Sequence, residues 1–184
     1  MVRRLHIAES VEIPENVTVT VDGLKVVVKG PKGELSKDFS YARDITIRLE
    51  DGRVVVEAFL ADRRKKALAG TIAAHIRNMI TGVTKGYRYK LKIISSHFPM
   101  TVVVDEKNRI VRIKNFIGEK ADRIAKIYGN AKVKVSGSDV IVEGLDIEEV
   151  GLTAASIERA TKIPDRDRRV FSDGIFIYEK GEAV

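Results

Sequence analysis

Arginine side chains cluster near the C-terminal end of the sequence, where their spacing suits ligand binding. Arg166, Arg168 and Arg169 alternate with Asp165 and Asp167. A guanidinium group is planar and donates to two phosphate oxygens at once, so arginine is well suited to phosphate recognition. The two aspartates neutralise part of this charge and are able to orient the guanidinium planes. The composition of the segment by itself therefore indicates a basic, arginine-bearing loop.

A second basic region contains no acidic residue between Asp62 and Asp105. A solvated helical face normally mixes both signs of charge, so a stretch of this kind needs a counter-charge from elsewhere, most simply phosphate. The run 63–66 on its own fits a solvated face as well as contact with RNA or a protein. The region holds nine cations: Arg63, Arg64, Lys65, Lys66, Arg77, Lys85, Arg88, Lys90 and Lys92.

The three histidines have no second histidine or carboxylate cluster at metal-ligand spacing. His75 lies beside the apolar side of a predicted helix and is interpreted as a boundary residue. His97 follows the basic stretch and comes directly after Ser96. It is either an ordinary loop residue or a group that stacks on a base or contacts phosphate together with the serine hydroxyl.

Catalytic motifs are missing from the sequence. Residues 30–34 contain two glycines and a lysine, but they lack the Walker spacing and are interpreted as a tight turn. Neither a Gly-x-Ser-x-Gly motif nor an isolated pair of carboxylates is found. We therefore expect a protein that is not an enzyme, with no catalytic residue, no metal, no cofactor and no small-molecule substrate.

Composition narrows the class of protein further. The chain has 184 residues, a net charge of +7 and no cysteine, which favours a reducing compartment and an anionic partner. It has no apolar run long enough for a membrane span and no signal-peptide pattern, so a cytoplasmic location is expected. Charged residues make up 32% and glutamine is absent, a bias that indicates a thermophilic source.

The sequence repeats itself with an offset of 83 to 86 residues. Because the matching blocks occur in the same order, we interpret them as two copies of one domain, each with its own core. The matches join residues 14–22 to 99–105, 24–29 to 109–114, 47–57 to 133–143, and 69–72 to 154–157.

Each copy is predicted to contain two hairpins and one helix. Asp22-Gly23 and Asp51-Gly52 are turn signals between runs of alternating apolar residues. The first helix is predicted from Asp62 to Thr81, with Gly82 ending it, and the second from Leu152 to Lys162. Two further strands, Leu35 to Tyr41 and Ala121 to Tyr128, are predicted because they occupy equivalent places in the repeat.

Two segments are interpreted as lying outside the duplication. Residues 83–98 are predicted to link the copies and to form a basic strand, and residues 163–184 form a C-terminal extension. The expected domains are therefore residues 1–82 and 83–184. Their net charges, +3 and +4, hardly differ. The second copy alone is flanked by the basic strand and the arginine-rich extension, so it is expected to be the main RNA-binding domain.

The C-terminal segment resembles a known family. Residues 169–177 (RVFSDGIFI), preceded by 154–161 (AASIERAT), resemble the C-terminal signature of large-subunit ribosomal protein six in its archaeal and eukaryotic branch. Residues 78–87 are similar to the family's junction between domains, and 96–99 to the loop that opens its second domain. Arg159 departs from the family, which often has glutamine there.

The resemblance implies an α+β fold of two tandem duplicated domains, each with antiparallel β-sheets packed against one α-helix. It further implies a structural constituent of the large ribosomal subunit that supports translation. In this family the second domain binds large-subunit ribosomal RNA near the sarcin-ricin loop and the GTPase-associated region. The first domain lies toward the stalk base, so neighbouring ribosomal proteins are expected partners.

The predicted site combines the residue patterns with the resemblance. Asp173 and Gly174 are expected to shape the turn that positions the binding groups. A module that binds an acidic protein is the second interpretation, and a small hydrolase is the third, for which the sequence offers no set of catalytic groups. The predicted RNA contacts are Lys85, Arg88, Lys90, Lys92, Ser96, His97, Arg159, Lys162, Arg166, Arg168 and Arg169.

Overall fold

The computed structural model describes residues 4–164, 167 and 169–183. The chain divides into two compact units, Met1–Lys85 and Gly86–Val184, here called the first and second domains. This division lies three residues after the boundary predicted from the sequence, because the first helix continues to Thr84. Among the described residues, no helix is long and apolar enough to cross a membrane.

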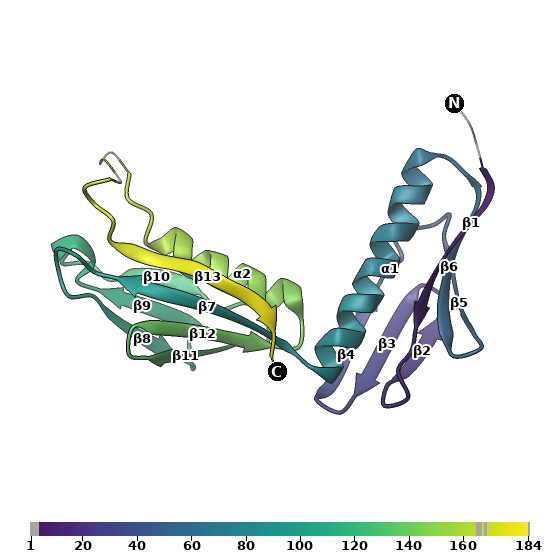
Figure 1. Cartoon of the computed structure of the whole chain (residues 1–184), viewed down its shortest axis with the longest axis horizontal. Coiled ribbons are helices and arrows are strands. Elements are labelled where there is room, and N and C mark those ends of the chain that lie inside the picture. The colour runs from purple at the N-terminus through teal and green to yellow at the C-terminus, as the bar shows by residue number, and fades with distance from the viewer. Residues whose placement is uncertain (1–3, 165–166, 168, 184) are drawn as a thin grey trace. The chain divides into compact units, whose positions relative to one another are not determined.

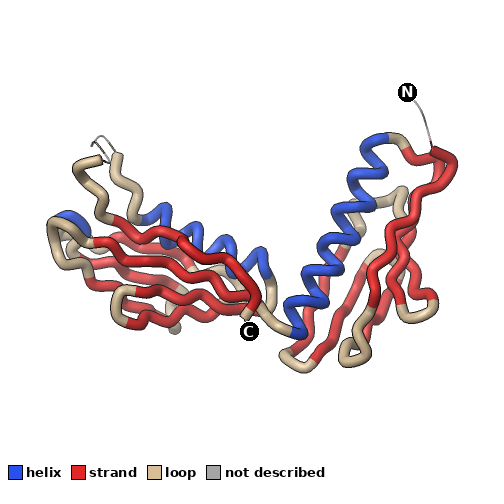
Figure 2. Tube along the Cα trace, viewed as in Figure 1, coloured by secondary structure: helices blue, strands red, loops and turns tan. Residues whose placement is uncertain are grey.

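The first domain packs one helix against two antiparallel sheets (Figures 1 and 2). The sheets have the strand orders β1-β6-β5 and β2-β3-β4. Its elements are β1 (Arg4–Glu12), β2 (Thr18–Asp22), β3 (Lys25–Gly30), β4 (Gly33–Asp38), β5 (Thr46–Glu50), β6 (Arg53–Ala61) and α1 (Arg63–Thr84).

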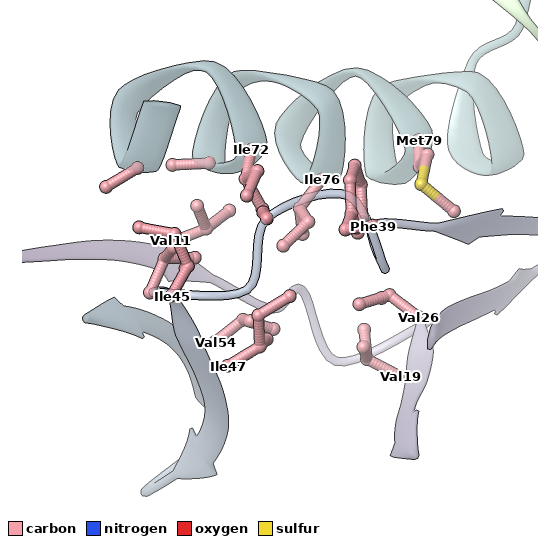
Figure 3. Packing of buried hydrophobic residues seen from close by; sticks show 14 of the residues in the cluster. Val11, Val19, Val26, Phe39, Ile45, Ile47, Val54, Ile72, Ile76 and Met79 are labelled. Atoms are coloured by element: carbon pink, nitrogen blue, oxygen red, sulfur yellow. The ribbon is translucent and has the colours of Figure 1, made fainter. Parts of the chain in front are cut away.

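The core of the first domain lies between α1 and the strands (Figure 3). Ile72 and Ile76 of α1 are fully buried, one helical turn apart, and so are Val26 of β3 and Val54 of β6. This spacing places both isoleucines on one face of the helix, where they remove apolar surface from water. The apolar periodicity that predicted the helix is thus the periodicity of the core.

The second domain has the same layers with one additional strand. Its sheets have the orders β11-β12-β7-β13 and β10-β9-β8, and α2 packs against both. Its elements are β7 (Tyr87–Ile94), β8 (Thr101–Asp105), β9 (Ile110–Lys114), a short 3-10 turn (Phe116–Gly118), β10 (Arg123–Lys126), β11 (Lys132–Ser136), β12 (Asp139–Gly144), α2 (Ile147–Ala160) and β13 (Gly174–Glu182).

The predicted α+β duplication is confirmed by this architecture. The hairpins at Asp22-Gly23 and Asp51-Gly52 join β2 to β3 and β5 to β6. Both Asp51 and Gly52 have positive φ, as the favoured two-residue hairpin turn requires. Strands are also present at both of the equivalent places, as β4 and β10, but β4 ends at Asp38 and not at Tyr41, and β10 covers only Arg123–Lys126.

The strand β7 belongs to the duplication, and its interpretation as part of a link outside the repeat is wrong. Val11 of β1 lies opposite Val54 of β6. Leu91 of β7 lies opposite Val140 of β12, which is the repeat partner of Val54. β7 therefore occupies in the second domain the place that β1 occupies in the first.

Three additional residues hide this relationship in the sequence. Val19 of β2 follows Val11 by eight positions. Val102, its counterpart in β8, follows Leu91 by eleven. The added length falls in the segment between β7 and β8, which contains His97. The second domain thus has a longer loop than the first at this position.

Both helix predictions need correction at their ends. Gly82 does not end α1, because it is buried in the helix and the last turn continues to Thr84; Gly86 is the glycine with positive φ that follows. α2 starts at Ile147 and not at Leu152, since the Asp146 side chain caps the helix by accepting from the backbone N of Glu148. It ends at Ala160.

The C-terminal extension completes the larger sheet of the second domain. β13 pairs antiparallel with the edge of β7 that β12 leaves open, with an irregularity in register between Ile177 and Glu179. In the part of the first domain that the structure describes, β1 pairs only with β6. The extra strand brings the segment between α2 and β13 next to the loop that follows β7.

Candidate nucleic-acid interface

A buried carboxylate organises the loop that follows β7. Asp173 is only 3% exposed. Its Oδ1 accepts from the backbone N atoms of Ser96, at 2.6 Å, and His97, at 3.0 Å. Its Oδ2 lies 2.6 Å from Nδ1 of the His97 ring. One side chain thereby fixes both the backbone and the imidazole of a loop 76 residues away in sequence.

These contacts also keep the carboxylate charged. Burial raises the pKa of Asp173, but the N–H donors of His97 and Ser96 outweigh it and hold the pKa below the ordinary value of 3.8. An ionised carboxylate only accepts hydrogen bonds, so Nδ1 of His97 carries the proton that it donates to Asp173. The Nε2 atom is then the ring nitrogen left for a ligand.

The His97 ring has an aromatic neighbour. Its centroid lies 4.9 Å from that of Phe171, with 26° between the ring planes. Beside it, the hydroxyls of Ser96 and Ser172 lie 3.2 Å apart. The two segments therefore present flat rings and hydroxyl groups together, which is the combination expected at a surface that meets unpaired bases.

The end of α2 is fixed against the rest of the domain. Arg123 donates to the carbonyl oxygens of Ala160, at 3.0 Å, and Lys162, at 2.8 Å, and forms a two-pronged ion pair with Glu119. Thr161 Oγ1 accepts from the backbone N of Ile175 at 2.9 Å. The last turn of α2 is held by β10 on one side and by β13 on the other.

The absence of a side chain at Gly174 allows the start of β13 to lie close to Thr161 at the end of α2. A Cβ atom placed there would lie 2.8 Å from the Phe176 ring, and the residue has a φ of +157°. Replacing Gly174 with alanine is expected to destabilise the second domain by about 1–3 kcal/mol, because both the contact and the backbone become strained. Thermal unfolding measures this loss.

Gly181 provides the matched control, because it lies on the same strand and a Cβ there meets nothing within 4 Å. Gly181→Ala is expected to leave the melting temperature nearly unchanged. Equal effects of the two substitutions would show that the clash at Gly174 is relieved without cost.

A hollow of about 410 Å³ lies between the end of α2 and the segment that leads into β13. Its walls combine apolar and charged side chains, with exposed Arg159 and Lys162 among them. The lining residues are Ile94, Glu158, Arg159, Thr161, Lys162, Ile163, Phe171, Ser172, Asp173 and Phe176.

The arginine-rich loop is described only in part. Arg169 is 91% exposed, and its Nε and second terminal nitrogen contact the carboxylate of Asp167 at 3.1 and 3.0 Å. Hydrogen bonds from Arg169 hold the pKa of Asp167 below its ordinary value. The aspartate thus orients a guanidinium group, as its position in the sequence suggested. Asp165, Arg166 and Arg168 lie outside the described residues.

Comparison with known proteins identifies the family of the chain. The family model for ribosomal protein L6 matches residues 13–86 and 98–174, one stretch in each domain. The chain belongs to the ribosomal protein L6 family. Members of this family are structural, non-enzymatic components of the large ribosomal subunit. This confirms the resemblance seen in the sequence and the expectation that the protein is not an enzyme.

The relatives belong to the archaeal branch of the L6 family. The large ribosomal subunit protein uL6 of Desulfurococcus amylolyticus is 75% identical over the whole of both chains. That of Staphylothermus marinus is 67% identical over 99% of each chain. That of Aeropyrum pernix is 59% identical over 98% of each.

The basic strand of this L6-family chain has its counter-charges inside the second domain. Arg88 Nε donates to Glu143 of β12 at 2.7 Å. Although burial raises the pKa of Glu143, that bond holds it below the ordinary value. Lys90 contacts Glu179 of β13 at 3.0 Å, and Lys92 contacts Asp139 of β12 at 3.2 Å. The expectation that this strand needs a counter-charge from outside the chain is therefore wrong.

Lys85 belongs to the first domain, whereas the other predicted contacts belong to the second domain of this L6-family chain. It is the C-cap of α1 and belongs to the first domain, where its backbone N donates to the Thr81 carbonyl. The structure brings together Ser96, His97, Arg159 and Lys162 around the end of α2. The strand cations lie on β7 of the same domain.

Several positioning residues of the L6 site were missed in the sequence. Arg123 and Glu158 were not among the predicted site residues, although Arg123 binds a backbone carbonyl at the end of α2 and Glu158 binds a backbone N–H of β13. Asp173 was expected to shape a turn, and its role in holding His97 was not foreseen. The Phe-Ser-Asp-Gly sequence at 171–174 was the available signal, since an aspartate between aromatic and glycine residues marks a specific turn.

Proposed function

We propose that the second domain binds large-subunit ribosomal RNA near the sarcin-ricin loop and the GTPase-associated region. Through this contact the domain acts as a structural constituent of the large subunit and supports translation. The observation that carries this proposal is the clustering of exposed cations around the loop that Asp173 fixes. Membership of the L6 family supplies the ribosomal context.

The main phosphate contacts are assigned to the groups around the end of α2. Arg159 and Lys162 border the hollow, and Arg169 is almost fully exposed. Arg166 and Arg168, which flank the ordered Asp167, are included on the sequence pattern. Because the backbone at the end of α2 is already fixed, binding does not have to order it, and this favours affinity.

The cations of β7 and Lys85 are assigned weaker contacts with RNA phosphates than the groups around the end of α2. Exposed ion pairs such as those of Lys90 and Lys92 contribute roughly 0–1 kcal/mol, so a phosphate is able to replace the carboxylate partner. Ser96 and His97 are assigned to sugar or base contacts, because the ring and hydroxyl lie together. The first domain is assigned to the side toward the stalk base and its proteins, a placement that cross-linking within the subunit tests.

An RNA hairpin carrying the sarcin-ricin sequence tests the main site. Replacing Arg159, Lys162 and Arg169 with alanine is expected to weaken binding about 10- to 100-fold and to lower the salt slope by about 2–3, because fewer counterions are released. Binding is measured by fluorescence anisotropy between 50 and 200 mM salt.

A charge-matched control uses Lys107, Lys132 and Lys134 of the same domain, which lie on β11 and the β8–β9 turn. Their replacement with alanine is expected to change the affinity less than threefold. An equal loss of RNA affinity in both variants would show that binding depends on net charge alone. A salt slope unaltered by the first variant would remove its three residues from the site.

Sedimentation of cell extract tests the ribosomal assignment itself. The protein is expected to travel with large subunits at low salt and to be released at high salt. Recovery in a protein complex that survives nuclease treatment would favour an acidic protein partner in place of RNA.

A further inference from the structure

One end of the first domain carries an exposed patch that the proposed function does not use. There β6 leads through Asp62 into α1, next to the start of β1 (Figure 1). We call this patch the α1 tip, and it consists of His6, Phe59, Leu60, Arg63, Arg64 and Lys66.

The apolar part of the α1 tip faces solvent. Phe59 is 54% exposed and Leu60 is 63% exposed, although both belong to a strand whose other apolar residues are mostly buried. The ring of His6 lies 5.0 Å from that of Phe59, across the β1–β6 pair. Phe59 and Leu60 each leave more than half of their surface in water, beside the tilted ring of His6, so packing within the domain uses only a minor part of these side chains.

The backbone at this point is also unusual. Leu60 has a φ of +48°, in the left-handed region that bulky residues rarely adopt. Glycine or asparagine adopts this conformation more easily. The strain keeps the leucine side chain outside the core at the end of β6. Strained positions of this kind are concentrated at binding sites and switches.

The charged part of the α1 tip has one sign. Arg63, Arg64 and Lys66 are exposed, and the first turn of α1 contains no acidic residue. Throughout the described chain, no carboxylate oxygen lies within salt-bridge distance of these three side chains. Lys65 differs, because it contacts Asp44 at 3.2 Å.

The nearest acid is already engaged. Asp62 caps α1 by accepting from the backbone N of Lys65 at 2.8 Å, and that bond lowers its pKa. Cations at the start of a helix are opposed by the helix dipole. The domain therefore carries three exposed cations at a position that its own electrostatics disfavour.

We propose that the α1 tip is a second RNA-binding surface, which takes unpaired nucleotides. A base stacks on Phe59 and Leu60, and the flanking phosphates contact Arg63, Arg64 and Lys66. Exposed aromatic groups beside cations are the combination that single-stranded nucleic acids require. An acidic protein surface would satisfy the cations but would leave the aromatic ring without a flat partner.

The absence of tryptophan from the chain makes a direct test possible. Phe59→Trp introduces a single tryptophan, whose fluorescence is excited selectively over that of the five tyrosines, at the α1 tip of the full-length protein. Titration with the oligoribonucleotide U12 is expected to quench its fluorescence in a saturable, salt-sensitive way, because a stacked base quenches indole. Adding Arg63→Ala, Arg64→Ala and Lys66→Ala to this variant is expected to weaken the apparent affinity at least tenfold.

A second triple variant controls for net charge. Lys25, Lys29 and Arg53 are exposed cations on strands of the same domain. Their replacement with alanine in the Phe59→Trp protein is expected to change the affinity less than threefold. Equal weakening by both triples would overturn the proposal, because it would show that binding follows total charge.

A reporter in the other domain separates the two RNA sites. Phe171→Trp reads the surface around His97 independently of Phe59→Trp. Quenching at residue 171 without quenching at residue 59 overturns the second site while leaving the first intact. Equal quenching of Phe59→Trp by polyglutamate would also overturn it, since an acidic polypeptide would then be an equivalent ligand. Quenching at residue 59 by U12 but not by polyglutamate supports it.

Discussion

Asp173→Asn is expected to destabilise the second domain by about 3 kcal/mol and to release the His97 loop. The carboxylate is buried and accepts from two backbone N–H groups and one imidazole N–H. An amide has one accepting oxygen in place of two, so at least one donor loses its partner, and buried donors without partners are costly. Chemical unfolding at pH 7 measures the loss.

The same substitution is expected to change the response to acid. The pKa of Asp173 in the folded protein lies below its ordinary value of 3.8. Its contribution to stability is therefore complete above that value and disappears as the pH falls through the folded-state pKa. The difference in stability between the original protein and Asp173→Asn should shrink once the pH is below about 4.

Asp167→Asn is the control, since this aspartate belongs to the same segment but is exposed and contacts only Arg169 among the described side chains. It is expected to leave the stability nearly unchanged. If Asp173→Asn unfolded at the same denaturant concentration as the original protein, the carboxylate would not be the anchor of the loop. RNA affinity should fall for Asp173→Asn because the ring of His97 is no longer oriented.

Leu91→Ala should produce a loss of similar size, about 3 kcal/mol, confined to the second domain. Leu91 is fully buried in the central strand β7, and removing three of its carbons leaves a cavity in close-packed surroundings. The cores of the two domains share no residue, one running from Ile7 to Val83 and the other from Tyr87 to Ile175. Hydrogen exchange of backbone amides measures the loss in each domain separately.

Val103→Ala is the matched control for Leu91→Ala, because Val103 lies on β8 of the same domain and is 41% exposed. It is expected to cost less than about 0.5 kcal/mol. Faster exchange throughout the first domain in Leu91→Ala would contradict the assignment of separate cores.

Local patterns in the sequence were sufficient for much of the fold. Alternating valines at 17, 19 and 21 and the Asp-Gly turns determine hairpins through contacts between near neighbours, so both hairpins were predicted correctly. The helical spacing of Leu68, Ile72 and Ile76 similarly predicted α1. The internal repeat then extended these assignments to β10, whose own periodicity was ambiguous.

Contacts between distant segments account for what the sequence did not show. The Asp173–His97 pair joins residues 76 positions apart, and no local pattern indicates that they meet. The counter-charges of Arg88 and Lys92 come from β12. Because β12 is distant in sequence, the absence of acids near these cations suggested that their counter-charges belong to a partner. Pairing across strands is decided by topology, which a linear charge pattern does not contain.

Helix ends were mispredicted for a related reason. A glycine ends a helix when its backbone takes positive φ, but Gly82 is instead a small residue buried within α1. Whether a glycine serves packing or termination depends on its neighbours in space. The charged first turn of α2, with Glu148 and Glu149, lacked the apolar periodicity used to detect the helix, although acids there are favourable.

The pairing of β13 with β7 has a consequence for the timing of biogenesis. Ile94 of β7 lies opposite Gly174, a residue synthesised eighty positions later. Because sheets closed by distant segments form slowly, this strand is the last element of its domain to dock during translation. When β13 docks, it also fixes the residue that follows α2, because the backbone N of Ile175 donates to Thr161 Oγ1. The RNA site proposed around the end of α2 is therefore expected to form only after β13 has docked, later than the α1 tip of the first domain.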